Sequence, residues 1–276
     1  MNLNGEAEDI NVSTVQPATQ ILETAANLLW SAAQSRQPCS PVRELLKDAG
    51  PDAAYAVQEI NTKRRLAAGA RLVGRKIGLT SAAVQKQLGV DQPDYGMLFA
   101  DMAVADGQTV SLAQLMQPKI EGEIAFVLGR DLDTPTPTIA DLLRAVDFAV
   151  AAIEIVDSRI QNWDIRLVDT IADNASAGMY VLGTQPRLLR DLDLVQCGMV
   201  MERRDESVSF GAGQACLGNP LAATLWLATT MARVGRPLRA GDTVLSGALG
   251  PMVAAVAGDV FQVRISNLGS VRVAFA

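Results

Sequence analysis

The sequence predicts an α+β protein in which helices come first and a mixed β-roll or barrel-like core follows. Apolar side chains recur at helical spacing from Thr19 to about residue 70. The C-terminal part consists of short β-rich runs separated by turns such as Gly258-Asp259. This punctuation is typical of a roll or barrel. We therefore expect three parts: a flexible leader (1–18), a helical segment packed on the core (19–70) and the core itself (71–276).

Composition narrows the classes of protein that this chain can represent. Its 276 residues are 49% hydrophobic and 20% charged, which is ordinary for a globular protein with a buried core. The net charge of −6 and the lack of a basic tract argue against nucleic acid and anionic membranes as partners. No apolar run is long enough to cross a bilayer, and residues 1–17 do not resemble a signal peptide. We expect a cytoplasmic protein.

The absence of histidine is the most informative exclusion in the sequence. Histidine-based triads, metal sites and general acid–base catalysis are impossible without it. The three cysteines lie far apart and form no CxxC pair, so neither a zinc site nor a disulfide framework is indicated. Any chemistry must use carboxylates, lysine, hydroxyls, backbone groups or a bound ion.

Local signals place the elements of the core. A strand is expected over Arg71–Leu79, and Thr80 can cap a short helix through Val84 and Leu88. Thr138 and Asp141 have the spacing of a capping box at the start of a helix. Further elements are a long apolar strand over 148–156 and a helix that opens at Asn219-Pro220.

Two acids lie on one face of an otherwise apolar strand over Pro118–Leu128. Because side chains of a strand alternate, Glu121 and Glu123 share one face, and Ile120, Ile124, Phe126 and Leu128 share the other. Neighbouring carboxylates repel and resist burial, and a hard divalent cation with oxygen ligands relieves both costs. A surface strand with two solvated acids is the alternative, and this segment alone does not decide between them.

Glu154 is a third acid in an apolar strand, within Ala151–Asp157. A lone acid in such a run is costly if it is buried and unpaired. A site that it shares with Glu121 and Glu123 explains its presence, and three protein oxygens leave room in an octahedral shell for a chelating substrate. An edge strand with an exposed glutamate is the alternative. Three such acids in a chain without histidine favour the metal site.

Other polar residues have both a functional and an ordinary interpretation. Lys76, in a strand that ends at a glycine, could bind a substrate carboxylate, transfer a proton or be solvated. Asp94 could be a base or only a turn former. Ser176 belongs to a run of small polar residues, 173–178, that could bind a ligand or cap a turn.

The order of several short motifs resembles that of one family. The motifs are Gly74–Ser81, Gln92–Gly96, Glu121-Gly122-Glu123, Glu154–Arg159, Asp169–Ser176 and Ser246–Met252. From Thr19 to the C-terminus the chain resembles the 2-keto-4-pentenoate hydratases of the fumarylacetoacetate hydrolase superfamily. The 4-oxalocrotonate decarboxylases share most of these segments. The resemblance implies a catalytic core of the fumarylacetoacetate hydrolase type.

The resemblance also implies roles for individual residues. It implies Mg²⁺ or Mn²⁺ held by Glu121, Glu123 and Glu154. It implies a catalytic group of Lys76, Asp94 and Ser176, and substrate binding by Lys76, Leu88 and Ser176.

The implied reaction is the hydration of 2-hydroxypenta-2,4-dienoate to 4-hydroxy-2-oxopentanoate in meta-cleavage degradation of aromatic compounds. Decarboxylation of 4-oxalocrotonate is the alternative on the same site, and a non-catalytic partner in an oligomer is a third. The implied partners are a small 2-hydroxydienoate or 2-oxo acid, further copies of the chain and a paralogous decarboxylase.

Overall fold

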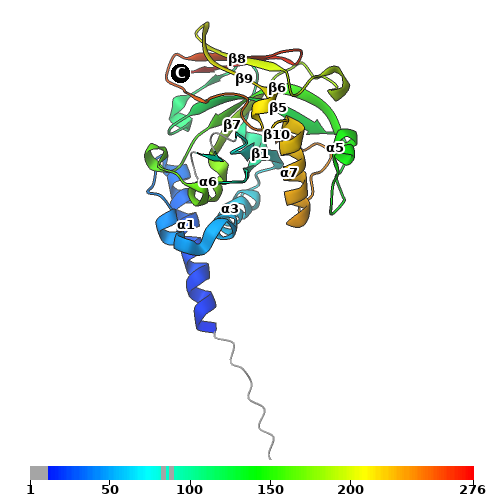
Figure 1. The fold of residues 1–276 in the computed structure, drawn as a ribbon. Helices are drawn as coiled ribbons and strands as arrows, with labels where there is room; N and C mark the ends of the chain where they lie inside the picture. The colour runs from blue at the N-terminus through cyan, green and yellow to red at the C-terminus, as the bar shows by residue number, and fades with distance from the viewer. Residues whose placement is uncertain (1–11, 82–84, 87–89) are drawn as a thin grey trace, which may run out of the picture.

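The computed structural model describes residues 12–81, 85–86 and 90–276 of the chain (Figure 1). The helix predicted through Val84 and Leu88 falls mostly on residues outside this part, as does the predicted role of Leu88 in substrate binding. The helices are α1 (Val12–Ser35), α2 (Arg43–Leu46), α3 (Gly50–Ala67), α5 (Ile139–Ala145), α6 (Leu167–Ala172) and α7 (Pro220–Arg233).

The N-terminal helices form a small apolar core of their own with α6. Leu29 of α1 and Val57 of α3 are buried against Ile171 of α6. Gln58 of α3 donates hydrogen bonds to the carbonyls of Tyr95 (2.9 Å) and Ile171 (3.0 Å), which ties the helices to the sheet. Helix α1 begins at residue 12, before the expected start at residue 19, because the helical conformation extends beyond the apolar repeat that made it detectable.

The larger sheet has eight strands and is strongly curved (Figure 1). Its order is β2-β1-β10-β5-β6-β7-β3, with β11 also paired to β5. The β1–β10 and β3–β7 pairs are parallel and the others antiparallel, so the sheet is mixed. The strands are β1 (Leu72–Gly78), β2 (Asp94–Phe99), β3 (Ala103–Val104), β5 (Lys119–Leu128), β6 (Val146–Val156), β7 (Ala177–Leu182), β10 (Thr243–Leu245) and β11 (Val253–Ala254).

A second sheet of five strands covers one face of the first, in the order β4-β13-β12-β8-β9. The strands are β4 (Thr109–Val110), β8 (Gly198–Arg203), β9 (Glu206–Ala212), β12 (Val260–Ile265) and β13 (Gly269–Phe275). At Gly122 a Cβ atom would lie 3.1 Å from the Val263 side chain and 3.2 Å from the sulfur of Met199. The glycine between Glu121 and Glu123 therefore lets the second sheet approach, while the two acids face the opposite way.

Several predicted elements are confirmed. The apolar face of β5 is buried as expected, with Ile120, Ile124 and Phe126 fully covered. The Thr138 side chain accepts from the Asp141 backbone, and Asp141 accepts from the Thr138 backbone, which completes the capping box of α5. The α+β class with N-terminal helices and a curved, barrel-like sheet is also confirmed. None of the described helices is long and apolar enough to span a membrane.

Candidate active site

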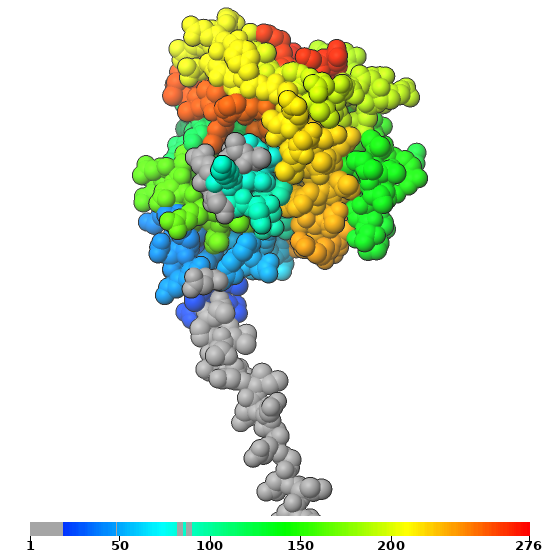
Figure 2. Space-filling model, viewed as in Figure 1, coloured from blue at the N-terminus to red at the C-terminus, as the bar shows by residue number. Residues whose placement is uncertain are grey.

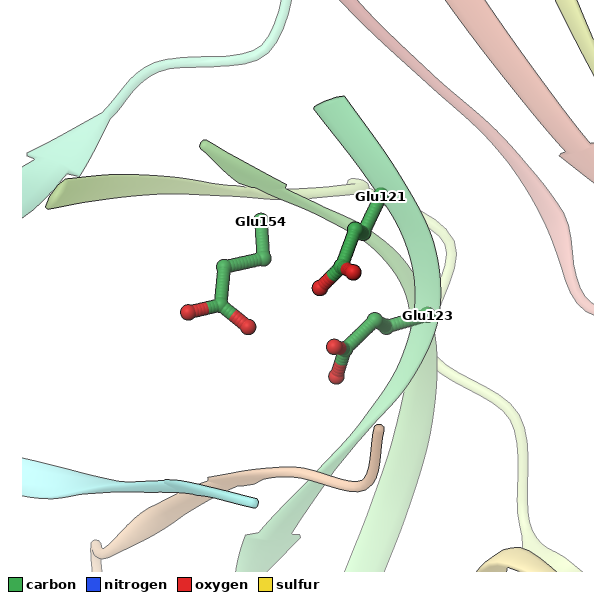
Figure 3. A group of neighbouring side chains, drawn as sticks. All are labelled: Glu121, Glu123 and Glu154. Atoms are coloured by element: carbon green, nitrogen blue, oxygen red, sulfur yellow. The ribbon is translucent and has the colours of Figure 1, made fainter. Parts of the chain in front are cut away.

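Strand pairing brings the three predicted metal ligands together. Glu121 on β5 lies directly opposite Glu154 on β6, and Glu123 follows two residues along on the same face. Ligand oxygens of the three carboxylates lie within 4.8 Å of one another. Figure 3 shows the side chains converging on one space beside the strands. Glu123 and Glu154 are buried and Glu121 is half-buried.

The surrounding protein balances only part of the charge of these carboxylates. Burial, with the neighbouring charge of Glu154, raises the pKa of Glu121 to about 7. The same two causes raise the pKa of Glu123 well above its usual range, and burial raises the pKa of Glu154. Keeping all three acids ionised therefore costs free energy unless a further cation is present.

Lys76 on β1 is the cation in direct contact with this glutamate group. Its Nζ lies 3.1 Å from Oε1 of Glu154 and donates to the carbonyl of Ala175 at 3.0 Å. Burial favours the neutral amine, but the charges of Glu154, Glu121 and the other nearby acids outweigh it and raise the pKa of Lys76. Lys76 is therefore a buried ammonium group, not the solvated lysine of the alternative interpretation.

Asp94, the first residue of β2, lies opposite Gly78 at the end of β1. A Cβ atom on Gly78 would be 2.2 Å from Oδ1 of Asp94, so only glycine leaves room for this carboxyl. Neither Asp94 oxygen has a hydrogen-bond partner of regular geometry, although the Thr170 hydroxyl is near enough to lower its pKa. Burial is the larger effect, and the pKa of Asp94 is raised overall.

Ser176 precedes β7 and points a free hydroxyl into the protein interior. Its Oγ is buried and has no hydrogen-bond partner among the described residues. The same holds for Oε1 of Glu123, for Oγ of Ser246 and for both carboxyl oxygens of Asp94. Buried polar atoms are nearly always hydrogen-bonded in folded proteins, so such atoms around one carboxylate group indicate a place for a ligand.

The segment after β10, which begins the Ser246–Met252 motif, contributes a backbone group to which the sequence alone assigned no role. The Gly247 backbone N–H donates to Oε2 of Glu123 at 2.8 Å and so orients that carboxylate. Gly247 has φ +112°, and a Cβ there would lie 2.2 Å from the Thr80 hydroxyl. In Figure 2, residues near 80 (cyan) lie beside the segment that follows β10 (orange). The Ser-Gly dipeptide after a buried strand was the available signal.

The residues fit a hard divalent cation. Three carboxylates face one lysine, so the group retains negative charge that a divalent ion would balance. Its donors are all oxygen, which suits the Mg²⁺ class and not the metals that prefer sulfur or imidazole. Glu121, Glu123 and Glu154 are the residues that would hold the ion.

This fold and this acidic site define a class of protein. The chain belongs to the fumarylacetoacetate hydrolase family, whose C-terminal domain profile matches residues 67–276. Within that family its sequence is similar, over more than nine-tenths of its length, to the 2-keto-4-pentenoate hydratases.

Two relatives illustrate the similarity. A protein named TodF product hydratase from Pseudomonas putida is 65% identical over 94% of this chain and 96% of its own. The 2-keto-4-pentenoate hydratase 1 of Dechloromonas aromatica is 61% identical over 92% of this chain and 97% of its own. The predicted family is thereby confirmed.

A solved structure supports the fold and a divalent metal in the family. The 4-oxalocrotonate decarboxylase from Pseudomonas putida G7, complexed with magnesium and adipate, has a TM-score of 0.89 and 34% identity. It covers 94% of this chain and 98% of its own. The same enzyme is also known complexed with calcium and acetate.

Proposed function

We propose that this protein is a hydro-lyase that adds water to 2-hydroxypenta-2,4-dienoate and forms 4-hydroxy-2-oxopentanoate in the degradation of aromatic compounds. The observation that carries the proposal is the buried glutamate group with Lys76, in a chain whose relatives are named for this hydration. The substrate is a small anion with a carboxylate next to the 2-oxygen.

We propose that Glu121, Glu123 and Glu154 hold Mg²⁺ or Mn²⁺. When bound, this ion would act as a Lewis acid on the 2-oxygen of the substrate. Glu121 is the most exposed of the three ligands, which is consistent with substrate entering from its side. The hydrogen bond from Gly247 holds Glu123 in a fixed orientation, as partners of metal ligands commonly do.

Lys76 is suited to hold the substrate carboxylate. Its ammonium group is buried and charged, and only Glu154 and one carbonyl occupy its donors among the described residues. An ammonium carries three donor protons, so one remains for an anion. The unpartnered hydroxyl of Ser176 is a candidate second donor.

Asp94 is suited to move the proton. Burial keeps its carboxyl group protonated to higher pH than usual, so it can act as a general acid. Protonation of the dienol at C5, with loss of its 2-hydroxyl proton to solvent, leaves a double bond between C3 and C4, conjugated to the C2 carbonyl. Water then adds at C4 and a proton from solvent adds at C3, which gives the 4-hydroxy-2-oxo acid. The deprotonated Asp94 would accept the proton of that water.

The structural similarity to 4-oxalocrotonate decarboxylase supports one competing reaction. That reaction also needs an enolate to be stabilised at the 2-oxygen, so the glutamate group and Lys76 serve both. Sequence identity favours hydration, because it is 61–65% to the two hydratases described above and 34% to the decarboxylase.

Parallel assays with the two substrates test the proposal. Purified protein with Mg²⁺ is incubated with 2-hydroxypenta-2,4-dienoate and, separately, with 4-oxalocrotonate. We expect loss of dienol absorbance with appearance of 4-hydroxy-2-oxopentanoate in the first, and little CO₂ in the second. Rapid CO₂ release from 4-oxalocrotonate, without hydration of the dienoate, would assign the decarboxylase reaction instead.

Other proposals rest on the family resemblance. We propose a cytoplasmic homo-oligomer that can associate with a paralogous decarboxylase. We further propose residues 1–18 as a leader and 19–70 as a helical segment on the core, with helix α1 reaching back into the leader to Val12. Light scattering after size-exclusion chromatography measures the subunit number, and co-purification with the paralogue measures the association.

A further inference from the structure

Three consecutive residues before β7 have a left-handed backbone. Asn174, Ala175 and Ser176 have φ values of 56°, 50° and 53° and form a single turn, η5 (Asn174–Ser176). L-amino acids avoid this region because Cβ crowds the next carbonyl, and among them asparagine is one of those that tolerate it best. Such backbone persists only where surrounding contacts hold it, and it is common at functional sites.

This left-handed turn lies at the active site. The carbonyl of Ala175 accepts the hydrogen bond from Lys76, and the next residue carries the unpartnered Ser176 hydroxyl. A turn of ordinary handedness would send these two groups in other directions. The unfavourable backbone therefore sets the position of the carbonyl that binds Lys76 and of the hydroxyl on the next residue.

The Asn174 side chain anchors the turn to the edge of the larger sheet. Its Oδ1 accepts from the Met97 backbone N–H at 2.7 Å, and its Nδ2 donates to the Met97 carbonyl at 3.0 Å. Strand β2 is the edge strand of the sheet, so the amide occupies the place of a neighbouring strand at this residue. Gly96 permits the approach, because a Cβ there would lie 2.2 Å from the Asn174 carbonyl oxygen.

The two ends of the turn are held in different ways. Asp173, just before it, is buried and bonded to Ser158 and Arg159. At the other end the Asp157 backbone N–H donates to the Ser176 carbonyl at 2.8 Å. Asn174 is uncharged, unlike Asp173 and Arg159, so its amide can be removed without leaving a buried charge unpaired.

We propose that Asn174 is a positioning residue, whose amide holds the left-handed turn so that the Ala175 carbonyl and the Ser176 hydroxyl face the substrate site. This inference rests on the proposed function, since it takes the Ser176 hydroxyl to donate a hydrogen bond to an anionic 2-oxo acid. Asn174 acts through the turn and does not itself touch the reacting atoms.

The informative variant is Asn174→Gly, because glycine adopts the left-handed backbone freely but lacks the amide. We expect kcat for dienoate hydration to fall about 100-fold, as an error of about 1 Å in a catalytic group can cause. Mn²⁺ affinity should stay within about twofold, because the metal ligands lie on β5 and β6. Asn267→Gly is the matched control: Asn267 is also left-handed (φ 61°) but lies exposed in the β12–β13 hairpin.

A double-mutant cycle separates positioning from general stability. In a Ser176→Ala background, Asn174→Gly should reduce kcat less than it does alone, because Ser176→Ala has already removed one of the two groups that the turn positions. Additive losses, or a kcat of Asn174→Gly within about twofold of the parent, would overturn the proposal.

Asn174→Asp keeps the acceptor for Met97 and loses the donor, so it should lose part of the activity. If Asn174→Gly does not fold, full activity of Asn174→Asp overturns the proposal, and so does failure of both variants to fold.

Binding of 2-oxopentanoate, a saturated 2-oxo acid, separates this inference from the reaction. Affinity is measured by calorimetry with Mn²⁺-loaded protein. We expect weaker binding to Asn174→Gly and unchanged binding to Asn267→Gly. A parent protein that binds the 2-oxo acid but does not hydrate the dienoate refutes the proposed function alone. Equal affinity of the parent and Asn174→Gly refutes the positioning role alone.

Discussion

Two groups of acids are enclosed by the protein, one on β5 and β6 and one in the segment that follows β6, and their surroundings differ. Asp157, Asp169 and Asp173 form the first group, and each is matched by donors. Asp157 accepts from the backbone N–H groups of residues 116 and 117, Asp169 from Arg43 and the Arg166 backbone, and Asp173 from Ser158 and Arg159. The second group is Glu121, Glu123 and Glu154, whose ion pairs among the described residues are limited to Lys76–Glu154.

The supply of hydrogen-bond donors distinguishes a structural acid from a functional one. A buried carboxylate with enough hydrogen-bond donors stabilises the fold, and its loss leaves the partner charges unpaired. A group of buried carboxylates with too few donors is stable as an ionised group only with a cation from outside. The two groups should therefore respond in opposite ways when one carboxylate becomes an amide.

The largest expected effect is that of Glu123→Gln. Loss of one charged ligand should lower metal affinity and reduce kcat/KM by at least about 1,000-fold, since a metal contributes several kcal/mol to charge stabilisation. The melting temperature without metal should not fall, because the change removes repulsion from a buried like-charged group. Calorimetry with Mn²⁺, turnover and thermal melts measure the three quantities.

The control is Glu206→Gln, at an exposed residue of β9. A clear fall in the metal-free melting temperature would contradict the comparison.

Lys76→Met should follow in size. The variant keeps the apolar stem but removes the ammonium group that contacts Glu154, so kcat/KM should fall about 100-fold or more. Steady-state kinetics measure the loss, with Lys63→Met on the exposed side of α3 as control. Unchanged kcat and KM would show that Lys76 has no part in the reaction.

Asp169→Asn tests the first group of acids. The amide cannot match the two hydrogen bonds from Arg43 and the one from Arg166, so we expect a loss of about 3 kcal/mol of unfolding free energy. Activity measured well below the melting temperature should stay near that of the parent. Denaturant unfolding measures the change, and Asp147→Asn on the exposed start of β6 should be nearly neutral. A loss of activity without a loss of stability would show that Asp169 serves the reaction and not the stability of the fold.

The smallest effect is expected at Thr138→Ala. This change removes the side-chain cap of α5, far from both acid groups, and should cost about 1 kcal/mol. The same unfolding experiment measures it. No change in stability would show that the capping box is not formed in solution.

The sequence was sufficient where the signal is local or strictly periodic. Strand alternation predicted that Glu121 and Glu123 lie on one face of their strand. The apolar run around Glu154 indicated a third acid of the same site. The capping box at Thr138 and the helix after Asn219 are likewise encoded by adjacent residues, and both are observed.

What the sequence could not give depends on contacts between distant segments. The Asn174 amide meets Met97 across 77 positions of the chain, and Gly247 meets Glu123 across 124. The direct pairing of Glu121 with Glu154 is also a matter of strand register, which single-strand patterns do not determine. The start of α1 was missed because its first turns lie outside the apolar repeat.

Titration of chelator-stripped protein with Mn²⁺, with binding and dienoate hydration followed together, shows whether the three glutamates hold an ion on which the reaction depends. We expect hydration to be absent in chelator and to rise in proportion to the occupancy of one ion per chain. In Glu123→Gln both curves should shift together to higher metal concentration. Full hydration activity in chelator, or activity that does not follow occupancy of this site, would contradict it.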